Sequence, residues 1–350
     1  MEGTTVEAVE TRPVEGDSLA KLLGDIRADF SVLHAGCGDG GCHCGVGGAG
    51  AFAFGRRLRP VLCISHRADR VTSVCFSPDG THVASGSWDG TVLVTRLADL
   101  STLELKGHSV KEVTSVRFSP DGEHIVSGSK EVRVWHAQSG RVVHEFPDDR
   151  GLNSVCFSPN GQHIAAGSES GAVRVWSMGS GELVHELRGH GDGVTSVCFS
   201  PDGRHIVSGS HRTCGVRVWN AQSGAQELEL YGHSQTVSSV CFSPDGERII
   251  SGSFDRSVRV WDSRTGQEVL EIRAPPYRGL WSVCVSPDGE RVAAGAFDGS
   301  IFVWNLRTGQ MEYEEGFGRH GWTLSVCFSP DGKRIVTGSK DGCIAMWSLE

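Results

Sequence analysis

Residues 71–106, VTSVCFSPDGTHVASGSWDGTVLVTRLADLSTLELK, decide the fold. The opening VTSVCFS alternates apolar and small polar residues and is rich in β-branched side chains, which predicts a strand. Pro78-Asp79-Gly80 predicts a turn, because proline presets one φ angle and glycine accepts a positive one. HVASGS and TVLVTR predict two further strands around a second turn, and an outer strand follows near residues 101–106. The unit is therefore four short strands joined by tight turns.

This unit recurs seven times along the chain. The turn prolines mark the copies at intervals of 39 to 43 residues: Pro78, Pro120, Pro159, Pro201, Pro244, Pro287 and Pro330. A second phrase, typified by G-S-x-D-G-x-V-R-V-W, follows each turn and ends in a tryptophan in all copies except the first, which has threonine: Thr95, Trp135, Trp176, Trp219, Trp261, Trp304 and Trp347. No segment from residue 61 onward has helical periodicity, so the sequence predicts a repetitive all-β protein.

The composition agrees with many turns and argues against several classes of protein. Glycine makes up 47 of 350 residues, about twice its average share. The formal net charge of −9 argues against sequence-independent binding to nucleic acid or to anionic membranes. No apolar run approaches 18 residues and the acidic N-terminus has no apolar core, so we expect neither a membrane-spanning helix nor a secretory signal. Twelve cysteines, six at one repeated position, predict buried thiols in a reducing compartment, and we expect an intracellular protein, cytoplasmic rather than nuclear.

The period, the S-P-D-G turn, the Gly-His pairs and the literal Trp261-Asp262 resemble WD40 repeats. The resemblance covers residues 61–350, and the likeness of the copies to one another resembles WD40 arrays of the fungal NACHT/heterokaryon-incompatibility type. It implies an all-β, seven-bladed propeller with four-stranded blades. The last copy supplies only three strands, so we expect residues 61–65 to pair with 343–348 and close the ring.

The segment before the propeller divides into three parts by composition. We expect a disordered acidic tail at 1–17, a short amphipathic helix at 18–30 and a Gly/Cys-rich linker at 31–60. The linker contains five potential zinc ligands: His34, Cys37, Cys42, His43 and Cys44. Their C-x4-C-x-C spacing is not that of a standard zinc finger, so exposed, oxidisable thiols are the preferred interpretation over a zinc site. We expect no cofactor.

The resemblance implies a hydrogen-bonded tetrad in each blade, which is structural because a buried indole N–H needs a partner. The fifth copy is complete, with His233, Ser251, Asp255 and Trp261. The third copy lacks both the histidine and the aspartate. The second has lost two residues before its third strand and the fourth has gained one. We expect these three blades to be looser than the others.

The resemblance also implies three partner-binding positions per blade on one end of the ring. Departures from the repeat at or beside these positions should carry function, because consensus residues build the scaffold. Blades five, six, seven and one place large apolar or cationic residues there: Arg70, Trp88, Phe254, Arg278, Trp281, Phe297, Trp322, Leu324 and Lys340. Clustered aromatic and cationic residues are typical of a binding hot spot. The alternative is that these side chains plug the channel or pack on the 18–30 helix.

No catalytic signature occurs in the chain, and the recurrent His, Ser and Asp follow the blade period, so we expect no enzyme. The predicted function is a scaffold, monomeric within a complex, that binds a partner protein or peptide. Trp261-Asp262-Ser263-Arg264 also resembles the box by which substrate receptors of cullin-RING ubiquitin ligases contact their adaptor, which would give Arg264 that role. An ordinary exposed arginine is the simpler interpretation. A recognition array of a NACHT-type receptor is a further alternative.

Overall fold

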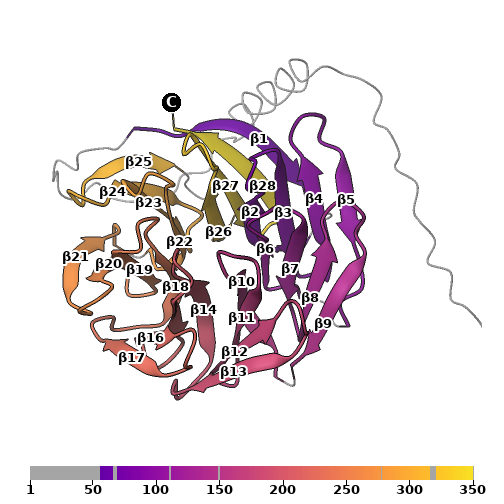
Figure 1. Cartoon of the computed structure of the whole chain (residues 1–350). Coiled ribbons are helices and arrows are strands. Elements are labelled where there is room, and N and C mark those ends of the chain that lie inside the picture. The colour runs from indigo at the N-terminus through magenta and orange to yellow at the C-terminus, as the bar shows by residue number, and fades with distance from the viewer. Residues whose placement is uncertain are drawn as a thin grey trace, which may run out of the picture.

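The computed structural model describes residues 56–65, 69–109, 112–148, 150–276, 278–315 and 321–349. These residues form seven four-stranded antiparallel sheets, arranged as blades in a ring (Figure 1). All regular structure in the described ranges is strand. The seven-bladed all-β propeller is therefore confirmed, whereas the predicted tail, helix and zinc-ligand cluster lie outside the described residues.

Each blade runs from an inner strand at the channel to an outer strand at the rim. The inner strands of blades one to seven are β2 (Val71–Phe76), β6 (Ser115–Phe118), β10 (Leu152–Phe157), β14 (Val194–Phe199), β18 (Val237–Phe242), β22 (Leu280–Val285) and β26 (Thr323–Phe328). The second strands are β3 (His82–Ser87), β7 (His124–Gly128), β11 (His163–Ser168), β15 (His205–Ser210), β19 (Arg248–Ser253), β23 (Arg291–Ala296) and β27 (Arg334–Ser339).

The outer half of each blade follows the same order. The third strands are β4 (Val92–Arg96), β8 (Glu131–His136), β12 (Ala172–Ser177), β16 (Val216–Asn220), β20 (Ser257–Asp262), β24 (Ile301–Asn305) and β28 (Cys343–Ser348). The outer strands are β5 (Thr102–Leu105), β9 (Val142–Pro147), β13 (Leu183–Arg188), β17 (Gln226–Leu230), β21 (Glu268–Arg273), β25 (Met311–Glu315) and, in blade seven, β1 (Arg59–Ser65).

The S-P-D-G phrase builds the turn after each inner strand. In blade five, Ser243 Oγ donates to Asp245 Oδ1 and accepts the backbone N–H of Arg248 at 2.9 Å. The hydrogen bond from Ser243 lowers the pKa of the Asp245 carboxyl, which favours the charged acceptor. Gly246 has a φ of 74°, a left-handed conformation that glycine adopts without steric cost. The repeated letters therefore encode one turn geometry.

Seven clusters of buried side chains fill the spaces between neighbouring blades. Trp261 of blade five, for example, packs against Val207 and Val218 of blade four. Glycine in the second strand allows the blades to approach: a Cβ at Gly252 would lie 2.4 Å from Val283 Cγ1 of blade six. The repeat thus fixes both the blades and the contacts between them.

The ring closes by pairing the two ends of the described chain. β1 pairs antiparallel with β28, beside which it lies in Figure 1. The inner strands β2 and β26 are also in contact, which completes the inner circle. The predicted pairing of 61–65 with 343–348 is confirmed. The strand starts earlier, at Arg59, and Leu58 is only 2 % exposed, so propeller contacts begin inside the predicted 31–60 linker.

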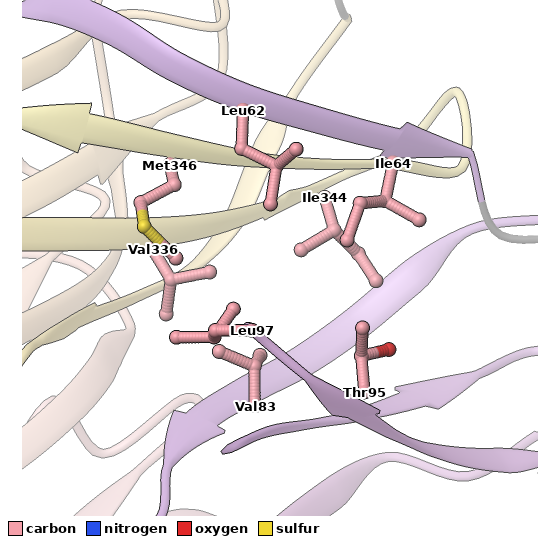
Figure 2. Close-up of a pocket in the computed structure, with 8 residues that line it drawn as sticks. All are labelled: Leu62, Ile64, Val83, Thr95, Leu97, Val336, Ile344 and Met346. Carbon is pink, nitrogen blue, oxygen red and sulfur yellow. The ribbon is translucent and has the colours of Figure 1, made fainter. Parts of the chain in front are cut away.

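The joint between blades seven and one contains a small apolar pocket of about 10 Å³, roughly the room of one water molecule (Figure 2). Side chains from β1, blade seven and blade one line it: Leu62, Ile64, Val83, Thr95, Leu97, Val336, Ile344 and Met346. Thr95 occupies the position that is tryptophan in the other blades. Ser85 Oγ, the hydroxyl that would accept the indole N–H, is buried without a hydrogen-bond partner among the described residues. The change from tryptophan to Thr95 therefore leaves both a small pocket and an unpaired hydroxyl in blade one.

Candidate functional site

The predicted tetrad of blade five forms one hydrogen-bonded chain. His233 Nδ1 lies 2.9 Å from Asp255 Oδ2, and His233 Nε2 lies 2.8 Å from Ser251 Oγ. The indole N–H of Trp261 donates to the same Oγ at 2.9 Å. Burial alone would raise the pKa of Asp255, but hydrogen bonds from His233, Ser257 and the backbone outweigh it, and the pKa lies well below its usual range. The set holds the tryptophan and offers no free nucleophile.

Blade two completes the same arrangement with a different acid. His108 Nε2 lies 2.6 Å from Ser127 Oγ, and its Nδ1 lies 3.1 Å from Glu131 Oε1. Trp135 donates to Ser127 at 2.7 Å. The longer side chain of glutamate spans the gap left by the two missing residues. Blade two thus forms a tetrad despite its deletion, and the expectation that it is looser stays a prediction.

Blade four keeps the histidine but lacks the acid. His190 Nε2 lies 2.7 Å from Ser208 Oγ, which also accepts the Trp219 N–H at 2.8 Å. His190 Nδ1 is buried without a partner among the described residues. Burial, helped by the nearby charge of Arg217, lowers the pKa of His190 to about 4. Asp192 instead accepts the backbone N–H groups of the enlarged turn.

Blade three substitutes an ion pair for the tetrad histidine. Asp148 Oδ1 accepts from Ser168 Oγ at 3.3 Å, and Oδ2 is paired with Arg174. Trp176 stacks on Phe146 with ring centroids 5.4 Å apart. The departure in blade three is therefore met by other local contacts, whereas blade four leaves His190 Nδ1 unpaired among the described residues.

Four aromatic residues from blades five, six and seven meet at one end of the ring. Phe254 contacts Trp281 and Phe297, with centroids at 5.4 and 4.8 Å. Trp322 reaches the same group, 5.9 Å from Trp281 and 5.0 Å from Phe297. We call Phe254, Trp281, Phe297 and Trp322 the aromatic cluster. Trp322 is 37 % exposed, and the other three are half-buried, so the cluster presents an apolar surface to solvent.

Two cations extend this surface across the joint into blade one. The Lys340 ammonium lies 4.0 Å from the centroid of Trp322 in blade seven. The Arg70 guanidinium lies 4.0 Å from the centroid of Trp88 in blade one. Both contacts are in the range of cation–π attraction, which holds the charge over the ring face. The surface therefore combines apolar area with positive charge.

Two of the predicted contact residues are not available at the surface. Leu324 is 6 % exposed, so its side chain belongs to the packed interior. The Arg278 guanidinium is paired with Asp298 at 2.8 Å and with Glu314 at 2.5 Å, and it lies over the Phe302 ring. The alignment of the repeats gives the position of each residue in its blade. It does not show which residues bury Leu324 or pair with Arg278. We remove Leu324 and Arg278 from the candidate site.

Arg264 lies at the opposite end of blade five from Phe254. It follows β20, whose last residue, Asp262, pairs with Arg248 at the start of β19, whereas Phe254 follows the end of β19. Arg264 is exposed, and its backbone N–H donates to Asp262 Oδ1 at 3.2 Å. The end of the ring that carries the aromatic cluster is thus distinct from the end that carries the W-D-x-R residues.

One departure from the repeat was missed in the sequence. Six inner strands carry cysteine at the same position, namely Cys75, Cys156, Cys198, Cys241, Cys284 and Cys327, whereas blade two has Arg117. Burial raises the pKa of the Cys75 thiol to about 12, and the Arg117 charge opposes this rise. Arg117 is exposed and donates to Ser73 Oγ at 3.2 Å. A comparison of the seven copies at this one position would have found it. The buried thiols are poor nucleophiles.

Potential metal ligands gather at one place in the described chain. Asp121, Glu123 and His124 bring one ligand atom each within 4.8 Å of the others. The Asp121 carboxylate already accepts from Ser119 and from the backbone of Glu123, as in the other S-P-D-G turns. We therefore assign no metal site there. Among the described residues, no helix is long and apolar enough to span a membrane.

Comparison with known families agrees with the blades. The family described as "WD domain, G-beta repeat" matches residues 59–95, 100–136, 267–305 and 314–348. The family described as "WDR90, 4th beta-propeller" matches residues 151–275, the span of blades three to five. No curated protein matches the chain. The four-stranded blades, the hydrogen-bonded tetrads and these matches together identify the chain as a WD40-repeat β-propeller.

Proposed function

We propose that this propeller is a non-catalytic scaffold that binds a partner protein or peptide through the aromatic cluster. The observation that supports the proposal is the mutual contact of four large rings at one end of the ring, with Trp322 37 % exposed. The buried positions that recur in every blade already fill the core, so the four rings are additions to the repeat at one end of the ring. Exposed aromatic clusters flanked by cations have the composition of binding hot spots.

The spacing of the rings limits the chemistry of the partner. Centroids 4.8 to 5.9 Å apart mean that the rings pack on each other. They leave no space between them for a methylated ammonium group, which needs ring faces on several sides. Lys340 and Arg70 also repel cations. We therefore propose a partner segment with an apolar side chain for the cluster and carboxylates for the two flanking cations.

More specific functions would use either the aromatic cluster or the opposite end of the ring. A recognition array of a NACHT-type receptor would use the aromatic cluster. A substrate receptor of a cullin-RING ubiquitin ligase would in addition use Arg264, which is exposed at the opposite end. We propose that the propeller acts as a monomer within such a complex, in the cytoplasm.

Affinity capture with four baits tests the proposal. The baits are the wild type, a Trp281→Ala/Trp322→Ala double variant, Arg264→Ala and Tyr231→Ala, with quantitative mass spectrometry of the captured proteins. Tyr231 is 70 % exposed and lies outside the cluster, so it controls for the loss of any exposed aromatic residue. We expect the wild type and Tyr231→Ala to capture the same partners in equal amounts. The double variant should capture at least tenfold less of these partners. Equal capture by all baits would refute the proposed surface, and loss of a cullin adaptor with Arg264→Ala alone would favour the ligase role.

A further inference from the structure

Two cysteines face each other across the strand pair that closes the ring. Cys63 in β1 and Cys343 in β28 have their Sγ atoms 2.6 Å apart, although 280 residues separate them in the chain. In the register, Cys63 lies opposite Ala345 and Ser65 lies opposite Cys343, so the two cysteines are diagonal neighbours. Both are free thiols. A disulfide has an S–S bond of about 2.05 Å, so a shift of roughly half an ångström would bring the sulfurs to bonding distance.

We propose that Cys63 and Cys343 are a modification site, at which glutathione disulfide oxidises the two thiols to a disulfide across the joint of the ring. The other cysteines of the repeat lie on inner strands and are buried or half-buried. Cys63 is exposed, which gives an oxidant access to one sulfur of the pair, and Cys343 is buried behind it. The pair therefore has an attacking thiol and a resolving thiol.

The environment assigns these two roles. A hydrogen bond from the Cys343 thiol lowers the pKa of Cys63 against the opposing effect of burial, and the same hydrogen bond, with burial, raises the pKa of Cys343. The Cys63 thiolate attacks one sulfur of glutathione disulfide, and the first glutathione leaves as a thiolate. Cys343 then loses its proton to solvent and attacks the Cys63 sulfur, and the second glutathione leaves. The protein dithiol loses two electrons, and one glutathione disulfide becomes two glutathione molecules.

The position of the pair gives the oxidation a consequence. β1 is held to β28 by a register that contains an irregularity between Pro60 and Leu62. Its apolar side chains Leu62 and Ile64 project into the pocket left where Thr95 replaces tryptophan (Figure 2). Release of β1 would expose the unpaired edge of β28. A bond between Cys63 and Cys343 would keep the two strands together, so we expect the oxidised ring to resist opening at this joint.

The test uses the full chain equilibrated in glutathione buffers of increasing oxidised fraction. Non-reducing peptide mapping should reveal a peptide pair linked through Cys63 and Cys343. The thermal midpoint should rise by roughly 5 °C on oxidation and return on reduction. Cys63→Ser should abolish both effects, because the attacking sulfur is absent. The variant should still fold, because position 63 is exposed and tolerates the hydroxyl. Cys214→Ser, at the half-buried Cys214 of blade four, is the matched control and should preserve both effects.

A second variant tests the order of steps. In Cys343→Ser the resolving sulfur is absent, so glutathione should remain bound to Cys63 as a mixed disulfide that mass spectrometry detects. The proposal is overturned if Cys63 becomes linked to a cysteine other than Cys343. It is also overturned if no Cys63 disulfide forms in an oxidising buffer, or if the link forms without any change in the thermal midpoint.

Discussion

The same serine-to-alanine substitution should have different effects in two blades. Ser251→Ala should destabilise blade five, whereas Ser85→Ala should not destabilise blade one. Ser251 and Ser85 occupy the same position of the second strand in these two blades. Ser251 Oγ bonds two buried groups, the Trp261 indole at 2.9 Å and the His233 ring at 2.8 Å. Ser85 Oγ is equally buried but has no partner among the described residues. The two substitutions remove the same atom from the same position of the repeat, but only Ser251→Ala breaks hydrogen bonds among the described residues.

The expected magnitudes follow from the groups left behind. Ser251→Ala leaves the indole N–H and the imidazole without their shared partner. Each unsatisfied buried group costs about 1–3 kcal/mol, so we expect a loss of roughly 2–6 kcal/mol. Ser85→Ala removes a hydroxyl that is already unsatisfied, so we expect no loss and a gain of up to about 1 kcal/mol.

Urea unfolding of the full chain, followed by tryptophan fluorescence and by circular dichroism, measures the difference. The midpoint of Ser251→Ala should fall clearly below that of the wild type, and the midpoint of Ser85→Ala should equal or exceed it. Equal losses in both variants would show that the hydroxyl acts through packing and not through its hydrogen bonds. That result would refute the reasoning on which the tetrad assignment rests.

Three further predictions follow from single positions. Because the pKa of His190 is lowered to about 4 and its unfolded value is about 6.5, the native state binds the proton less readily than the unfolded chain. The free energy of unfolding should therefore fall as pH drops from 6.5 toward 4, by about 2 kcal/mol at pH 5. The thermal midpoint of His190→Gln should depend less on pH in this window than that of the wild type. Gly252→Ala should destabilise by about 1–3 kcal/mol in urea unfolding, because its Cβ would lie 2.4 Å from Val283 Cγ1, whereas Gly179→Ala, with nothing within 4 Å, should have almost no effect. Glu131→Asp should destabilise blade two by about 1–2 kcal/mol in the same assay, because the shorter acid no longer reaches His108, and an unchanged midpoint would contradict the compensating role of the glutamate.

The blade count and the ring closure could be predicted because the determinants repeat. Each S-P-D-G turn uses hydrogen bonds within five residues, such as those of Ser243 with Asp245 and Arg248, so the local sequence is sufficient to specify it. The closure followed from the last copy, which has three strands where the others have four. The repeat also indicated where the aromatic cluster lies, because equivalent positions of the repeat lie at the same end of every blade.

The environment of individual side chains could not be predicted in the same way. Arg278 occupies a position at the rim of the predicted surface, but Asp298 and Glu314, which pair with it, come from a later turn and an outer strand. Glu131 replaces the tetrad aspartate because its length offsets a deletion, an effect that exists only in three dimensions. Residues that depart from the repeat therefore show where to look, and their partners decide what they do.

The proposed binding surface and the closing strand pair both involve blades seven and one, and this couples binding to closure. Lys340 and Trp322 lie on blade seven, and Arg70 and Trp88 lie on blade one, on either side of the joint. A partner that contacts both pairs can bind only the closed ring. Such a ligand stabilises the state that it binds, by about 2.7 kcal/mol at one hundred times its Kd. We therefore expect a partner and the oxidation of Cys63 to act on the same equilibrium, so that oxidation raises affinity for a partner that spans the joint and leaves the affinity for one confined to blades five and six unchanged.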